Sequence, residues 1–214
     1  MDVVLDNLDL YLKGMRTTVS LTLLSYGAAL VIGTVVAAFR VSPVPPLRAV
    51  GALYVGVVRN TPLAVLMVGF LVGAGDVGIK FSFFTTAVIV LSAYTGAFVG
   101  ETVRSGVNAV ARGQGEAARA LGLTFPQVLR IVVLPQAFRT VVAPLGSIFI
   151  ALIKNSALAA LISVNELSGT TEQLINETAQ YLPIFLGAAA AYLVLTIPSG
   201  LLVGVIERKV AIKR

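Results

Sequence analysis

The chain has no cysteine, no histidine and no tryptophan, and only 12% of its 214 residues are charged. Without cysteine there are no disulfides or thiolate ligands, and without histidine the commonest general base and metal ligand are missing. We therefore expect neither a metal site nor a catalytic residue in this chain. Apolar side chains dominate instead. Hydrophobic residues make up 57% of the chain, against about 45–50% in soluble domains, which indicates a membrane protein.

Five apolar runs are long enough to cross a bilayer, which takes about 20 residues each. They lie at residues 15–39, 51–75, 83–103, 140–164 and 184–206. We expect an all-α membrane protein in which residues 1–214 form a single transmembrane domain. The runs also contain glycines four residues apart, which predict close helix packing. These pairs are Gly69/Gly73, Gly96/Gly100 and Gly200/Gly204.

The distribution of basic residues predicts how the spans are oriented. Three segments outside the spans hold most of them: Arg40 and Arg48; Arg104, Arg112, Arg119, Arg130 and Arg139; and Arg208, Lys209, Lys213 and Arg214. The alternate segments are poor in basic residues, so the positive-inside rule places the N-terminus outside and the C-terminus in the cytoplasm. The formal charge of +6 lies between apolar runs. That placement fits membrane lipid headgroups as a partner and no nucleic acid.

One predicted cytoplasmic loop, at about residues 105–139, has a pattern of its own. The run 116–121 is rich in strong helix formers, and Gly122 follows it, where a left-handed cap is easiest. Thr124 begins a capping-box pattern that predicts a second helix. Pro135 should end or kink that second helix.

The first of these helices is suited to a partner surface. We expect Glu116 at its N-terminal end, where the helix dipole favours an acidic side chain. Ala117 and Ala118 make the helix thin, so it can settle into a groove.

These residues resemble a known motif. Glu116-Ala117-Ala118, Gly122 and Leu134-Pro135 look like the EAA loop of ABC importer permeases, in which an isoleucine takes the place of Val132. The flanks resemble the polar amino-acid branch of that family. The segments that carry this are Arg112-Gly113-Gln114, Leu134 to Arg139, Arg59-Asn60-Thr61-Pro62-Leu63 and Lys154-Asn155-Ser156-Ala157-Leu158. Arg40-Val41-Ser42-Pro43-Val44 and residues 58–63 are most similar to the glutamate-uptake permeases of actinobacteria.

The resemblance implies a type I ABC importer permease fold that crosses the bacterial plasma (inner) membrane several times. It implies uptake of a polar amino acid by alternating access, with glutamate as the expected substrate and glutamine or another polar amino acid as the alternative. The implied partners are an ATP-binding subunit in two copies, a second permease subunit that is a sister protein, and an extracellular amino-acid-binding protein. The coupling residues that it implies are Glu116, Ala117, Ala118, Arg119, Gly122 and Pro135.

The nucleotide chemistry is expected in another chain. The sequence has no Walker A pattern, Gly-x-x-x-x-Gly-Lys-[Ser/Thr], so ATP and Mg would be bound by the partner subunit and no cofactor by this chain.

Lys154 is the most unusual charge of the spans. It follows Arg139 by about fifteen residues, or roughly 22 Å of helix, a depth at which a lysine is costly unless it faces a cavity or a carboxylate. Lys154 either lines a translocation path or has a structural role. In the structural role it forms a buried pair or extends its side chain to the outer interface. Asn155 and Ser156 lie at a similar depth and bond either a substrate or neighbouring helices.

Arg59 precedes Thr61-Pro62, where the helix should bend. Arg59 either lines an inner gate or pairs with Glu101 of the third span, and we expect the pairing because an unpaired arginine there would be expensive. The candidate residues of the substrate path are Lys154, Asn155, Ser156, Arg59 and Thr61.

The predicted outer loop carries Glu166, Glu172 and Glu177. We expect a solvated acidic loop, with a docking surface for the binding protein as the alternative. Two rival functions come from other classes. An intramembrane enzyme would need titratable groups converging at one depth, and Glu101 is the only acid near a span interior. A passive channel would not need a coupling helix.

Overall fold

The structure is a computed structural model that describes residues 2–210, so the basic residues Lys213 and Arg214 lie outside the described part. Helices make up almost all of the described chain. They are α1 (Asp2–Asp6), α2 (Leu8–Val41), α3 (Pro45–Asn60), α4 (Leu63–Asp76), α5 (Phe83–Asn108), α6 (Arg112–Ala120), α7 (Phe125–Gln127), a π-helical stretch (Val128–Val133), α8 (Leu134–Asn155), a 3-10 stretch (Ser156–Ile162), α9 (Leu167–Thr178) and α10 (Tyr181–Val210). The all-α prediction is confirmed.

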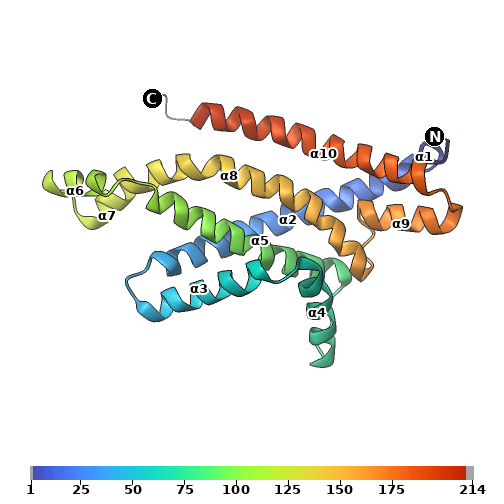
Figure 1. Ribbon diagram of the computed structural model, residues 1–214, viewed down its shortest axis with the longest axis horizontal. Coiled ribbons are helices and arrows are strands. Elements are labelled where there is room, and N and C mark those ends of the chain that lie inside the picture. The colour runs from blue at the N-terminus through green and yellow to red at the C-terminus, as the bar shows by residue number, and fades with distance from the viewer. Residues whose placement is uncertain (1, 211–214) are drawn as a thin grey trace.

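Within residues 2–210, four helices are long and apolar enough to cross a membrane. They are α2, α5, the continuous helix Phe125–Ile162 that contains α7 and α8, and α10. These helices run along one common direction in Figure 1. The pair formed by α3 and α4 provides a fifth candidate, but the two helices are bent by 107° at a short break. The five expected spans are therefore found in residues 2–210 only if the bent pair of α3 and α4 is counted as one span.

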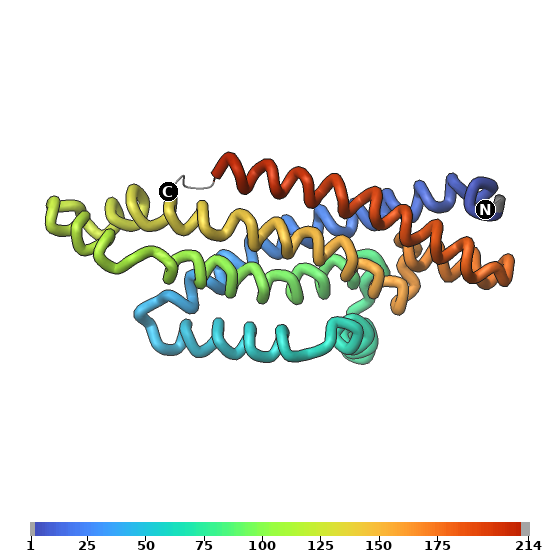
Figure 2. Tube along the Cα trace, turned by 45° about the horizontal axis from the view of Figure 1, so that its top comes forward, coloured from blue at the N-terminus to red at the C-terminus, as the bar shows by residue number. Residues whose placement is uncertain are grey.

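The predicted span at residues 51–75 is formed by two helices, α3 and α4, with a break between them. Thr61 is extended (φ −99°, ψ 130°) after the end of α3. Pro62 has no backbone N–H and disfavours a helical conformation of the residue before it. The bend predicted at Thr61-Pro62 is thus confirmed, and it is much sharper than a kink. Figure 2 shows α4 nearly end-on while the long helices run across the view.

α2 and α5 approach each other closely at glycines. A Cβ atom added at Gly33 would collide with the Val99 side chain and lie 2.8 Å from the Gly100 backbone nitrogen. Of the three predicted glycine pairs, Gly96/Gly100 is the one that packs in this way, because nothing in the described part of the chain lies within 4 Å of a Cβ added at Gly69 or Gly73. α5 also contacts α3, α4 and α8, which makes it the centre of the bundle.

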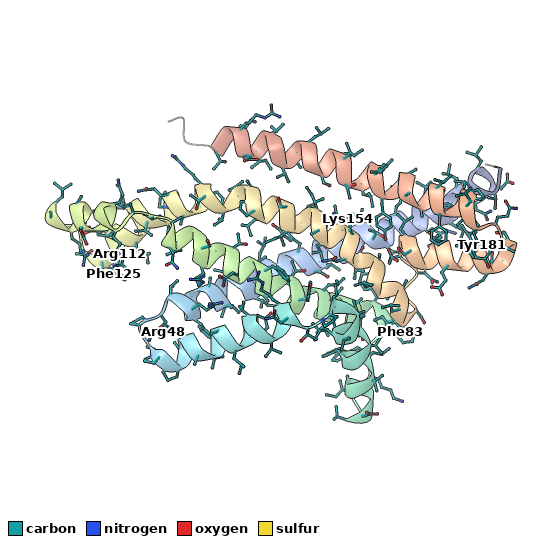
Figure 3. All side chains as sticks on the ribbon, in the orientation of Figure 1. Arg48, Phe83, Arg112, Phe125, Lys154 and Tyr181 are labelled. Carbon is teal, nitrogen blue, oxygen red and sulfur yellow. The ribbon has the colours of Figure 1, made fainter. Side chains whose placement is uncertain are left out.

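The two ends of the bundle carry different elements. α1 and α9 lie at one end, and α6, α7 and the last turn of α10 lie at the other (Figure 1). Arg48 and Arg112 are at the α6 end and Tyr181 is at the α9 end (Figure 3). The described parts of the three basic segments predicted to be cytoplasmic therefore lie toward one end of the molecule. The membrane orientation itself stays a prediction.

Candidate functional site

The loop between α5 and α8 projects beyond the bundle as two packed helical pieces (Figure 1). Gly122 has φ +84°, so the left-handed cap predicted after α6 is confirmed. The capping box is confirmed as well, since the Gln127 side-chain oxygen accepts from the Thr124 backbone N–H at 2.8 Å. These features form where the sequence predicts them because each depends on residues only a few positions apart.

The start of α6 differs from the prediction. The helix begins at Arg112 rather than at Glu116, so Glu116 lies in the second turn and the N-terminal dipole argument for it does not hold. The two glycines before Glu116 are weak helix formers. The helix nevertheless extends over them, and Gly115 faces Val128 of the following π-helical stretch. Tertiary packing has overridden local propensity here.

The surface of α6 is accessible. Glu116, Ala117 and Arg119 are exposed, whereas Ala118 is buried under the loop. Sequence reasoning missed two further residues at the tip, Leu121 and Phe125, which are 82% and 74% exposed. The sequence could have indicated this surface, because a large apolar residue stands on either side of the turn at Gly122. Exposed apolar side chains beside a loop helix are typical of a protein contact surface.

Pro135 does not end the second helix. The chain stays helical from Phe125 to Ile162, with Pro135 in the first turn of α8. The preceding Val128–Val133 stretch is π-helical, which widens the turn ahead of the proline and removes the need for its missing N–H. Of the two predicted outcomes at Pro135, an end or a kink of the helix, the end is therefore wrong. The loop and the interior of the bundle are joined by one unbroken helix.

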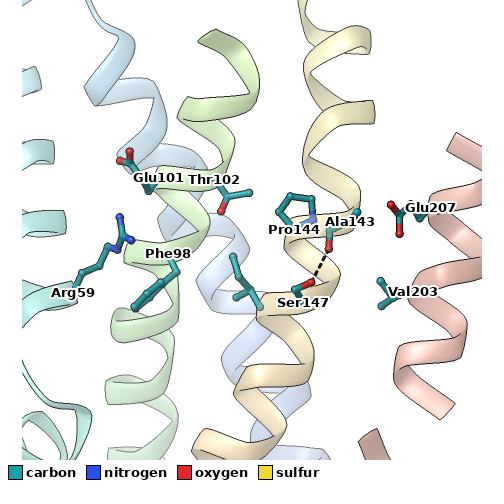
Figure 4. A pocket seen from close by; sticks show the side chains of 10 residues that line it. Arg59, Phe98, Glu101, Thr102, Ala143, Pro144, Ser147, Val203 and Glu207 are labelled. Carbon is teal, nitrogen blue, oxygen red and sulfur yellow. Dashed lines mark hydrogen bonds between the residues drawn. The ribbon is translucent and has the colours of Figure 1, made fainter. Parts of the chain in front are cut away.

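A groove of about 620 Å³ opens near the loop end of the bundle (Figure 4). α5 and α8 form its floor through Phe98, Thr102 and Ser147, with Arg59 of α3 on one side and Glu207 of α10 on the other. A groove of this size can accommodate a small polar solute.

Arg59 lies over an aromatic ring instead of against a carboxylate. Its guanidinium carbon is 4.9 Å from the centroid of the Phe98 ring. Glu101 is occupied by two other arginines, Arg40 of α2 at 2.7 Å and Arg104 of α5. The predicted pairing of Arg59 with Glu101 is therefore wrong, because Arg40 reaches Glu101 from a neighbouring helix. The alternative, that Arg59 lines a cavity, agrees with its place in the groove.

The other candidate path residues do not gather with Arg59. Lys154 is exposed in the last turn of α8 (Figure 3) and is not among the residues that line the groove. Ser156 is buried and its hydroxyl donates to the Ile153 carbonyl at 2.7 Å, while the Thr61 hydroxyl donates to the Val57 carbonyl at 2.8 Å. Asn155 is half-buried beside Ser156. Only Arg59 of the five lies in the groove.

The acidic residues of the outer loop divide into two kinds. Glu172 and Glu177 are exposed and line a hollow of about 580 Å³ together with Asn165 and Asn176. Glu166 is fully buried, so the expectation that it is solvated is wrong. Burial raises the pKa of the Glu166 carboxyl, and hydrogen bonds from Tyr192, Gly169, Ser168 and Thr18 offset part of that rise. Glu166 caps the N-terminus of α9. The sequence could have indicated this capping role by the position of an acidic residue just before a helix, because acidic residues favour helix N-caps.

Comparison with known proteins agrees with this architecture. Residues 29–212 match the family model described as "Binding-protein-dependent transport system inner membrane component". The glutamate transport system permease protein GluC of Corynebacterium efficiens is 39% identical, with 95% of each chain covered. The probable glutamine ABC transporter permease protein GlnM of Bacillus subtilis is 32% identical, covering 97% of this chain and 96% of GlnM.

Chains of two solved ABC transporter structures also superpose on this chain. A chain of a crystal structure described as an amino acid ABC transporter with histidines superposes with a TM-score of 0.92 at 31% identity, covering 96% of both chains. A chain of the inward-facing methionine ABC transporter MetNI superposes with a TM-score of 0.82 at 21% identity, which bears on the fold alone. The rival intramembrane enzyme and passive channel are thereby set aside. The chain belongs to the family of binding-protein-dependent transport system inner membrane components and is a membrane-spanning permease subunit of an amino-acid ABC importer of the bacterial inner membrane.

Proposed function

We propose that this permease carries glutamate inward by alternating access, driven by ATP and Mg bound to a partner ATP-binding subunit present in two copies. The observation that carries the coupling part of the proposal is the unbroken helix from Phe125 to Ile162, which begins at the exposed loop and ends at the other end of the bundle. At 1.5 Å per residue it spans about 55 Å. A displacement of the loop by the ATP-binding subunit would move the whole of this helix.

The coupling surface consists of α6 and the turn after it. Glu116, Ala117 and Arg119 face outward, and Leu121 and Phe125 add apolar area beside them. Gly122 sets the direction of the turn with its positive φ. Pro135 lies in the first turn of α8, the helix that follows this loop. The resemblance to the EAA loop supports the assignment of these residues to the contact with the ATP-binding subunit.

The Glu116→Lys variant tests the coupling role. Reversing the charge in the middle of the contact surface should lower ATP-driven uptake in reconstituted vesicles about tenfold or more, because like charges placed across an interface are strongly unfavourable. Asp76→Lys, at an exposed acid on α4, is the matched control and should leave uptake near the wild-type rate. Intact uptake in Glu116→Lys vesicles would show that Glu116 has no part in coupling.

The charge around the groove supports an anionic substrate. Arg59 is the basic residue among those that line the groove, which also include the acids Glu101 and Glu207. The charge of Glu101 is compensated by Arg40 and Arg104 from outside the lining, so Arg59 is free to meet a substrate carboxylate. Glutamine is the second candidate, because relatives of both names match the chain at high coverage.

Uptake by the reconstituted transporter distinguishes glutamate from glutamine. With radiolabelled glutamate, unlabelled glutamate should compete more strongly than glutamine. The Arg59→Gln variant should weaken glutamate uptake about tenfold, the loss of one charged hydrogen bond, and should affect glutamine less. Preferred uptake of glutamine by the wild-type transporter would replace glutamate with the second candidate.

Lys154, Asn155 and Ser156 belong to the proposed path at a greater distance from the loop. Lys154→Ala should raise the substrate concentration needed for half-maximal uptake, with Lys80→Ala at an exposed residue after α4 as the control. The same concentration in both variants would remove Lys154 from the path. Thr61, at the sharp bend before α4, is proposed to shape the path through the backbone, because its hydroxyl is bonded to Val57.

The two remaining partners, a sister permease and an amino-acid-binding protein, would bind to exposed surfaces of the bundle. A sister permease would complete the path on the groove side of the chain. An extracellular amino-acid-binding protein would dock at the α9 end, where Glu172 and Glu177 line an exposed hollow that suits basic side chains. With this arrangement the C-terminus lies in the cytoplasm and the N-terminus outside, in agreement with the positive-inside rule.

A further inference from the structure

The carboxylate of Glu166 joins three helices at the end of the bundle opposite the coupling loop. It caps α9, because Oε1 accepts from the backbone N–H groups of Ser168 at 2.7 Å and Gly169 at 3.0 Å. Its other oxygen, Oε2, accepts from the Thr18 hydroxyl of α2 at 3.1 Å and from the Tyr192 hydroxyl of α10 at 2.8 Å. All of the carboxylate's partners are therefore on α2, α9 and α10.

Further hydrogen bonds tie the same groups together. Thr18 Oγ1 accepts from the Leu167 backbone N–H at 3.1 Å, and the Ser168 and Tyr192 hydroxyls lie 2.8 Å apart. Each helix is thus fixed to the next by more than one bond. Glu166 forms no ion pair with any Lys or Arg of residues 2–210.

A buried carboxylate without a cation is a costly way to hold helices together. An apolar side chain of similar volume would pack without the desolvation penalty that an acid suffers. What the carboxylate adds is direction, since its hydrogen bonds fix the angles at which α2, α9 and α10 meet.

The long helix that begins at the coupling loop leads directly into this cluster. It ends at Ile162, and Ser163 turns the chain with φ +63°. The Glu166 backbone N–H then donates to the Val164 carbonyl at 2.9 Å, and α9 starts at the next residue. The coupling loop therefore lies at the start of the long helix, and Glu166 follows the end of that helix after one short turn.

We propose that Glu166 is a positioning residue for transport: through Thr18 and Tyr192 it makes the outer ends of α2, α9 and α10 move together with the long helix. The inference rests on the proposed function, because it requires that the α9 end receives the binding protein and the opposite end receives the ATP-binding subunit. Glu166 would then link binding of the substrate-loaded binding protein to ATP hydrolysis without touching the substrate.

The test uses the complete transporter in vesicles and measures ATP hydrolysis with and without the glutamate-loaded binding protein. Tyr192→Phe removes one hydroxyl and keeps the ring, and Glu166→Gln keeps the side-chain volume but replaces one acceptor oxygen with a donor. In both variants the stimulation by the loaded binding protein should fall about fivefold or more, the lower range of measured allosteric couplings, while basal hydrolysis persists. Tyr181→Phe and Asp76→Asn, at exposed positions, are the matched controls.

The outcomes separate this inference from the proposed function. Wild-type stimulation in both variants would overturn the inference. Loss of assembly with the ATP-binding subunit, or loss of basal hydrolysis, in both variants would also overturn it, because the cluster would then be structural only. If only Glu166→Gln fails to assemble, the stimulation measured in Tyr192→Phe tests the inference: a reduced value supports it and a wild-type value overturns it. If the wild-type transporter itself is not stimulated, the proposed function fails before the variants are compared.

Discussion

Arg40 and Glu101, 61 residues apart in the sequence, form an ion pair of 2.7 Å between Arg40 Nη1 and Glu101 Oε2. The pair joins the end of α2 to α5, and Arg104 holds the other oxygen of the same carboxylate. Both charged side chains of the pair are mostly shielded, at 21% and 26% exposure. The pair therefore fixes the loop end of α2 against the central helix, beside the groove that contains Arg59.

Removing the charge of Glu101 should destabilise the protein measurably. Glu101→Gln removes the negative charge and replaces one of the two acceptor oxygens with a donor, so we expect a loss of about 2 kcal/mol in the free energy of unfolding. Thermal unfolding in detergent would measure it. In a double-mutant cycle with Arg40→Gln, the two changes should be non-additive by about 1 kcal/mol, because they remove the same bond. Additive effects would mean that the ion pair contributes no coupling. Glu207→Gln, on the other side of the groove, is the control.

Two glycines of α2 should respond in opposite ways to the same substitution. Gly33→Ala places a methyl group against Val99 and the backbone of Gly100, so we expect a loss of about 1–3 kcal/mol in stability. Gly27→Ala meets nothing within 4 Å in the described chain and should be neutral or stabilising by up to about 1 kcal/mol, because alanine is the better helix former. Equal melting temperatures for the two variants would contradict the close packing of α2 on α5.

The apolar residues at the tip of the coupling loop should matter for assembly and not for folding. Leu121→Ala and Phe125→Ala remove side chains that are largely exposed in the isolated chain, so its melting temperature should change little. Association with the ATP-binding subunit should weaken about tenfold or more if these side chains anchor the contact. Co-purification and titration of the two subunits would measure this. Leu182→Ala, at a residue of α10 that is 71% exposed, should leave the affinity unchanged.

Stability should depend on pH through Glu166. Burial raises its pKa above the ordinary value of 4.5, so the folded protein binds this proton more tightly than the unfolded chain does. The stability that protonation provides is complete below the unfolded pKa and is lost as the pH rises through the folded pKa.

The Glu166→Gln variant isolates this effect. The unfolding free energy of the wild type should fall relative to that of Glu166→Gln as the pH rises from about 4.5 upward, and the difference should level off above the folded pKa. Denaturant unfolding at a series of pH values would measure it. A constant difference across this range would contradict the assignment. Glu172→Gln, at an exposed position of α9, should leave the shape of the wild-type curve unchanged.

The parts of the site that could be predicted depend on residues that are close together in the sequence. The cap at Gly122 and the bond between Thr124 and Gln127 form within one or two helical turns, so the sequence specifies them. The sites that were mispredicted depend on residues far away in the chain. The sequence predicted Arg59 as the partner of Glu101, and only the packing of α2 on α5 brings Arg40 within reach instead.

Apolar run length and loop charge are local properties, so the sequence alone predicts a helical membrane protein, and its Glu-Ala-Ala pattern predicts a loop that resembles the EAA loop. Tertiary structure decided the rest. It buried Glu166 among Thr18 and Tyr192, and it brought Arg40 instead of Arg59 to Glu101. Each of these depends on contacts between segments that are distant in the chain, and local propensity has no information about such contacts.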